Sequence, residues 1–141
     1  QPNDPEWDLF IKEVRKEMTL KSGQRCTGVR RIFVPQSHLS VVAESLQKAL
    51  AQTIIGSPLN EKVRMGSLAG MSQREEVLTQ VKKLLASSQL IYGSLDSVEV
   101  VDADSIKGAF LSPLLLLNEK PPLSCKPEII LFEVCCATAI L

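Results

Sequence analysis

Residues 23–35 read GQRCTGVRRIFVP and place a cysteine in a glycine-bearing turn. Cys26 lies between Arg25 and Arg30, and nearby cations favour the thiolate, which is the nucleophilic form of cysteine. The apolar run within residues 30–34 predicts a short buried strand. The stretch therefore predicts a turn with a reactive thiol that leads into a β-strand.

Helices are expected on either side of this unit. Asp4 followed by Pro5 is a helix start, because a capping residue precedes a proline at the first helical position. Apolar residues then recur at helical spacing from Trp7 to Met18, and this helix should end near residues 21–23. A second helix should be capped by Ser37 and should end before the turn signal at residues 56–58.

A third helix should open at Ser72, which forms a capping box with Glu75. The period then changes, and strands are expected at residues 90–92, 98–101, 109–117 and 128–134. Pro113 should place its strand at an edge or bend it. Strands that alternate with helices over 141 residues indicate a single α/β domain with a mostly parallel sheet. The apolar runs 114–117 and 129–132 suit strands covered on both faces.

Composition excludes several classes of function. Sixteen basic and sixteen acidic residues cancel, and without a segregated basic patch we expect no nucleic-acid partner. No apolar run reaches the length of a membrane helix, and the N-terminus lacks the features of a signal peptide. We therefore expect a cytoplasmic protein without a membrane partner.

The cysteines and acids do not suggest a metal or a disulfide framework. No Cys-x-x-Cys pair and no second histidine are present, so we expect no metal site. Asp102 and Asp104 are expected to form a polar turn. The remaining cysteines are expected to be incidental: Cys125, Cys135 and Cys136.

Five short motifs follow one another along the chain: GQRC at 23–26, IGSP at 55–58, MGSL at 65–68, SQRE at 72–75 and GAFLSPLL at 108–115. In this order they resemble the cysteine-bearing catalytic domain of the aldehyde dehydrogenase superfamily, with coverage from about residue 4 to about residue 117. Residues 4–35 are similar to one branch in particular, the dehydrogenase half of the bifunctional enzyme that opens the oxepin-CoA ring in phenylacetate degradation. The resemblance implies a three-layer α/β fold whose mostly parallel sheet has flanking helices.

The resemblance also implies that Cys26 is the catalytic nucleophile. In the family reaction a thiolate attacks an aldehyde, hydride passes to NAD or NADP, and water activated by a glutamate hydrolyses the thioester. The backbone N–H of the cysteine is one donor to the developing oxyanion. The resemblance to the ring-opening branch implies a CoA-linked semialdehyde as the substrate of the parent enzyme.

Other parts of the family's machinery have no counterpart in this sequence. The glycine-rich dinucleotide-binding loop, the base glutamate and the oxyanion asparagine all precede the cysteine in the family. We therefore expect residues 1–141 to form a partial catalytic domain that lacks a dinucleotide-binding domain and binds no cofactor alone. Glu133 matches the family's ribose-binding glutamate, but the Phe-Gly-Pro that should follow is missing.

Several residues near the cysteine have two interpretations. Arg25 and Arg30 either favour the thiolate, or are simply solvated or paired with acids. Gln24 is expected to shape the turn rather than to take part in chemistry. His38, the only histidine, is expected to be a surface or capping residue rather than a base.

Three functions compete at this stage. The first is an aldehyde dehydrogenase fragment, and the second is a non-enzymatic domain that forms homo-oligomers because residues 128–141 leave an unprotected strand edge. The third is a redox or thioesterase-like activity at Cys26. Titration with cofactor separates the first from the others, and thiol labelling against pH separates the third from the second.

Overall fold

The computed structural model describes residues 4–118 and 129–135, which form three α-helices and a four-stranded sheet. In chain order the elements are α1 (Pro5–Thr19), the 3₁₀ turn η1 (Leu20–Gly23), β1 (Arg31–Pro35), the 3₁₀ turn η2 (Gln36–His38), α2 (Leu39–Ala51), α3 (Met71–Leu84), β2 (Gln89–Tyr92), β3 (Leu114–Asn118) and β4 (Ile129–Cys135). The three predicted helices are confirmed. No helix within the described ranges has the length and apolar character of a membrane span.

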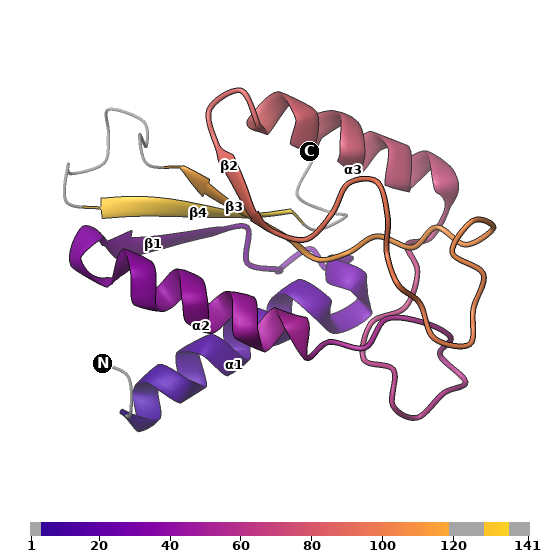
Figure 1. The fold of residues 1–141 in the computed structure, drawn as a ribbon, viewed down its shortest axis with the longest axis horizontal. Helices are drawn as coiled ribbons and strands as arrows, with labels where there is room; N and C mark the ends of the chain where they lie inside the picture. The colour runs from indigo at the N-terminus through magenta and orange to yellow at the C-terminus, as the bar shows by residue number, and fades with distance from the viewer. Residues whose placement is uncertain (1–3, 119–128, 136–141) are drawn as a thin grey trace.

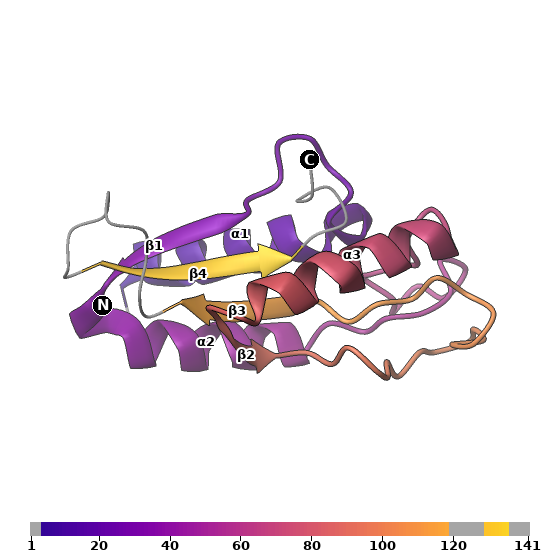
Figure 2. The ribbon, with the colours of Figure 1, turned by 90° about the horizontal axis from the view of Figure 1, so that it is seen from above.

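The strands lie side by side in the order β1-β4-β3-β2 (Figure 2). Each neighbouring pair is antiparallel, so the prediction of a mostly parallel sheet is wrong for the described strands. The connections explain the difference. Only residues 119–128 join β3 to β4, whereas a parallel crossover needs a dozen or more residues, usually including a helix. Residues 93–113 join β2 to β3 without a helix.

The predicted strand edges are also wrong. Pro113 directly precedes β3, which pairs on both sides, so the missing proline N–H falls outside the ladder. Strand β4 lies between β1 and β3, which leaves β1 and β2 at the edges of the sheet. The predicted strand at 98–101 does not form, because Val101 makes only an isolated bridge to Gly56.

Helices cover both faces of the sheet, and the predicted three layers are confirmed. Helices α1 and α2 lie on one face and α3 on the other (Figure 1). Each face of the sheet packs against its helices in a separate hydrophobic core. Alternate residues of β3 pack into one core or the other, since successive side chains of a strand point to opposite faces. Leu115 and Leu117 pack with Met18 and Leu46 on the α1/α2 face, whereas Leu114 and Leu116 join the α3 core.

Two of the predicted helix caps differ from the structure. Asp4 caps α1 as predicted, since its Oδ1 accepts from the Glu6 N–H at 2.9 Å. The Ser37 hydroxyl instead lies 3.0 Å from Nδ1 of His38, which is the N-cap residue of α2. Helix α3 starts at Met71 after Gly70, so Ser72 lies inside the first turn and forms no capping box.

Candidate active site

The turn that holds Cys26 begins with three residues in the left-handed region: Lys21, Ser22 and Gly23, with φ of 52°, 56° and 72°. Left-handed backbone costs about 1–2 kcal/mol for a residue with a side chain. Other contacts must therefore hold Lys21 and Ser22 in place. The Gln24 N–H donates to the Lys21 carbonyl at 3.0 Å, and the Arg25 N–H donates to the Gly23 carbonyl at 2.9 Å.

Side chains from this turn anchor it to the loop around residues 66–69. The hydroxyl of Ser22, a buried residue, donates to the Gly66 carbonyl at 2.8 Å. The Gln24 amide donates to the Lys21 carbonyl at 3.0 Å and accepts from the Ala69 N–H at 2.9 Å. The Gln24 side chain thus bridges two segments that are 45 residues apart, which confirms that it shapes the turn.

Cys26 sits at the second position of a tight turn. The Gly28 N–H donates to the Arg25 carbonyl at 3.2 Å and closes this turn. Gly28 lies so close that an added Cβ would be 3.3 Å from the same carbonyl oxygen. The Cys26 side chain is a free thiol and is exposed. Within the described residues the Cys26 backbone N–H has no acceptor, so a thiol and a main-chain donor are available at one residue.

The arginine before the cysteine is paired with an acid. Nη1 of Arg25 lies 2.7 Å from Oε1 of Glu17, and the two side chains are 30% and 19% exposed. The carboxylate offsets the charge that Arg25 would present to the thiol. Arg30 is half-buried. For Arg25, the interpretation as the partner of an acid is therefore confirmed.

The later motifs are held together by contacts to the main chain. Gly56 bridges Val101, and an added Cβ would lie 2.1 Å from the Val101 oxygen. The Leu68 N–H donates to the Ala109 carbonyl at 2.9 Å, and Nε of Arg74 donates to the Phe110 carbonyl at 2.8 Å. These contacts fix the loop that receives Ser22 and Gln24.

Asp102 and Asp104 serve loop structure, as predicted. Oδ2 of Asp102 accepts from Nδ2 of Asn60 at 2.6 Å. Oδ1 of Asp104 accepts from the N–H groups of Ile106 and Lys107. Among the described residues no group of three or more potential metal ligands lies together.

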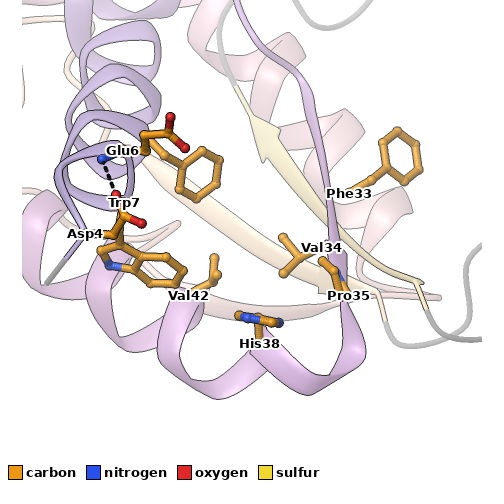
Figure 3. Close-up of a pocket in the computed structure, with 9 residues that line it drawn as sticks. Asp4, Glu6, Trp7, Phe33, Val34, Pro35, His38 and Val42 are labelled. Atoms are coloured by element: carbon orange, nitrogen blue, oxygen red, sulfur yellow. Dashed lines mark hydrogen bonds between the residues drawn. The ribbon is translucent and has the colours of Figure 1, made fainter. Parts of the chain in front are cut away.

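His38 lies at the opposite end of α1 from the Cys26 turn. It lines a cavity of about 360 Å³ between the start of α1, β1 and the start of α2, together with Trp7, Phe33 and Val42 (Figure 3). Helix α1 has 15 residues and is about 22 Å long. His38 occupies the N-cap position of α2 without a side-chain capping hydrogen bond, and the structure does not bring it to the thiol.

Glu133 lies in β4, where its Cα pairs with Arg31 on one side and Leu116 on the other. Its role as a ribose ligand stays a prediction. Cys135 ends β4 opposite Leu114, and Cys125 and Cys136 lie outside the described residues.

A second cavity, which was not predicted from the sequence, lies along the end of α1 nearer the Cys26 turn. Its volume is about 530 Å³, and five cations line it: Lys12, Arg15, Lys16, Lys62 and Arg64. The available signal was the spacing of the first three, since residues i, i+3 and i+4 share one helix face. For Ser22, by contrast, the sequence contains no signal that its hydroxyl would be buried, because the residue looks like part of an ordinary helix end.

The fold and the turn together define an α/β domain of three layers that presents a free thiol after its first helix. The family model described as "Aldehyde dehydrogenase family" matches residues 3–128. The chain therefore belongs to the aldehyde dehydrogenase family.

Individual relatives agree with this assignment. The chain is 38% identical over 120 residues to a 3,4-dehydroadipyl-CoA semialdehyde dehydrogenase of Aromatoleum evansii, a match that covers 85% of this chain and 23% of that protein.

Two solved structures show the same fold. One is a variant of aldehyde dehydrogenase C from Pseudomonas syringae in complex with NAD⁺ and octanal, with a TM-score of 0.68 and 18% identity over 79% of this chain and 22% of that chain. The other is an NAD⁺ complex of an aldehyde dehydrogenase from Bacillus cereus, with a TM-score of 0.66 and 23% identity over the same shares. The chain thus spans less than a quarter of the length of these proteins.

Proposed function

We propose that this chain is the cysteine-bearing part of the catalytic domain of an NAD(P)-dependent aldehyde dehydrogenase, with Cys26 as the nucleophile. One observation carries the proposal. The thiol is free and exposed in a tight turn, and the N–H of the same residue has no acceptor among the described residues. A nucleophile and an oxyanion donor are the two groups that attack on a carbonyl requires.

The chemical step that these residues support is addition to the aldehyde. The thiolate Sγ of Cys26 forms a bond to the carbonyl carbon, and the π electron pair of the carbonyl moves to its oxygen. The resulting negative charge can accept a hydrogen bond from the Cys26 N–H, which needs no reorganisation because the turn already fixes it.

The nicotinamide cofactor does not fit the described residues. The sequence has no glycine-rich phosphate loop between a strand and a helix, so we propose that residues 1–141 are a partial catalytic domain and that the dinucleotide-binding domain lies elsewhere in the enzyme. The cofactor would supply hydride acceptance there. Glu133 is our candidate for the contact with its ribose.

We further propose that the substrate is a CoA-linked semialdehyde of the kind formed in phenylacetate degradation, in the cytoplasm. The name of the relative from Aromatoleum evansii supports this substrate class. The free thiol of Cys26 suits a reducing compartment.

Labelling with iodoacetamide tests the proposal. We expect Cys26, followed by peptide mass spectrometry, to label readily at pH 7, and a simple aldehyde to slow this labelling where the matching alcohol does not. Cys125 in the same sample is the internal control. Equal labelling of Cys26 with aldehyde and with alcohol would contradict the proposal. In a mixture with a chain that carries the dinucleotide-binding part, NADH formation should require Cys26 and should disappear in Cys26→Ala.

A second candidate function is self-association without catalysis, which one observation favours. Strand β1 is an edge of the sheet, and Phe33 on it is 54% exposed. An exposed apolar side chain on an edge strand favours pairing of that strand with a second copy of the chain. Light scattering at high protein concentration should then show a homo-oligomer that Phe33→Lys dissociates, and a monomeric wild-type chain would exclude this candidate.

A further inference from the structure

The basic cavity at the thiol end of α1 combines two separate parts of the chain. Lys12, Arg15 and Lys16 come from α1, whereas Lys62 and Arg64 come from the loop between α2 and α3. Among the described residues, those that line the cavity include no Asp and no Glu. Five cations therefore face one volume of about 530 Å³, which is within the range of small-molecule sites.

Most of this charge is not offset by acids. Lys16 pairs with Glu13 at 2.9 Å. Within the described residues, Lys12, Arg15 and Lys62 form no ion pair. Like charges that gather in this way repel one another in the free protein, and a bound anion removes the repulsion.

Arg64 is held in place without being neutralised. Its Nη1 donates to the carbonyl oxygens of Glu61 at 2.6 Å and Val63 at 2.9 Å. These are neutral acceptors, so the guanidinium keeps its charge, and its other donors stay available to a ligand. Arginine forks and lysine ammonium groups are the side chains that bind phosphate in proteins.

The rest of the cavity suits a nucleotide rather than a bare phosphate. Leu20 and Ile54 line it with apolar surface and are 41% and 39% exposed. Gln52 and Thr53 add polar side chains. A heterocyclic base can pack on the apolar residues while its phosphates meet the cations.

We propose that this cavity binds the phosphate-bearing nucleotide end of coenzyme A, carried by a CoA-linked aldehyde. The inference rests on the proposed function for its substrate class. The position agrees with that role, because α1 runs from the cavity directly into the Cys26 turn and the pair of Glu17 with Arg25 holds this turn to the last part of α1. The acyl arm of the ligand would then extend towards the thiol.

Calorimetric titration of the chain tests the site. We expect coenzyme A to bind, dephospho-coenzyme A to bind more weakly, and pantetheine, which lacks the phosphates, not to bind. The double variant Lys12→Gln, Lys62→Gln should raise the Kd for coenzyme A at least tenfold. The matched control is Lys82→Gln, Lys83→Gln, which removes two exposed cations from α3 on the other face of the sheet and should leave the Kd unchanged.

Three outcomes would overturn the proposal: pantetheine binding as tightly as coenzyme A, equal effects of the two double variants, or displacement of coenzyme A by tripolyphosphate at equal concentration. The variant Cys26→Ala separates this proposal from the chemistry at the thiol. Coenzyme A binding that survives in Cys26→Ala would support the site even if the thiol proved unreactive towards aldehydes. A thiol that reacts with a simple aldehyde in a chain that binds no coenzyme A would leave the proposed function intact and exclude the site.

Discussion

The two ends of α1 differ in charge and in packing. Among the described residues, the cavity at the start of the helix is lined by Asp4 and Glu6 beside aromatic side chains and by no lysine or arginine. The described residues that line the cavity at the other end include five cations and no acid. The two cavities beside α1 thus carry opposite charges in a chain whose formal net charge is zero.

The helix dipole explains only part of this separation. Acids in the first turn and bases in the last turn each stabilise a helix by about 0.3–1 kcal/mol, and α1 follows this rule with Glu6, Asp8 and Lys16. The rule says nothing of Lys62 and Arg64, which the fold brings from another segment. The basic end is therefore a feature of the tertiary structure, and the turn that holds the free thiol of Cys26 follows this end of the helix.

The largest difference between the two ends should appear in packing. Met18, in the last turn of α1, is 2% exposed, and Met18→Ala should lower the free energy of unfolding by about 3 kcal/mol. Trp7 at the acidic end is only half-buried, so Trp7→Ala should lower the free energy of unfolding by less than Met18→Ala does. Urea unfolding measures both, and Leu9→Ala, at a position that is 56% exposed, is the control and should change stability by less than about 0.5 kcal/mol. An equal loss for Trp7→Ala would mean that the two ends are packed alike.

Two serines give a finer comparison of the same ends. Ser22→Ala should destabilise by about 1–3 kcal/mol because it leaves the Gly66 carbonyl without its donor. Ser37→Ala should change stability by less than about 0.5 kcal/mol, since within the described part of the chain the Ser37 hydroxyl hydrogen-bonds only to the His38 ring, at an exposed position.

A third variant separates backbone strain from the hydrogen bond. Ser22→Gly loses the same hydroxyl but accepts a φ of 56° without strain, so it should be about 1 kcal/mol more stable than Ser22→Ala. Thermal unfolding of the three variants checks the order. Should Ser22→Ala unfold like the wild type, the bond to Gly66 would not anchor the turn.

These residues also show how far the sequence could predict the structure. The apolar spacing from Trp7 to Met18 and the Asp4-Pro5 start are local signals, and α1 forms where they indicate. Strand direction is not local, because it depends on whether a connection is long enough to cross over. The alternation of helices and strands suggested parallel pairing, whereas the short 119–128 connection required antiparallel pairing.

Some features of the candidate site could likewise be predicted from the sequence, and others could not. The motif around Cys26 located the turn, and Gln24 was correctly interpreted as a residue that shapes it. A count of sixteen acids against sixteen bases could not locate the basic cavity, because its members are far apart in the chain and meet only after folding. The sequence also could not show that Glu17, eight residues before Arg25, would be the partner of that arginine.

The smallest expected effect concerns the charge at the thiol itself. Glu17→Gln removes the partner of Arg25 and should lower the free energy of unfolding by about 1 kcal/mol or less, because both side chains are partly exposed and screened by solvent. Its effect on reactivity should be easier to detect. A cation that is no longer offset favours the thiolate, so Cys26 should label faster with iodoacetamide at pH 7 in Glu17→Gln than in the wild type. Glu13→Gln breaks the comparable pair with Lys16, which belongs to the basic cavity and not to the turn, and should leave the labelling rate unchanged. Equal rates in the two variants would mean that Arg25 only fastens the turn to α1 and does not influence the reactivity of the thiol.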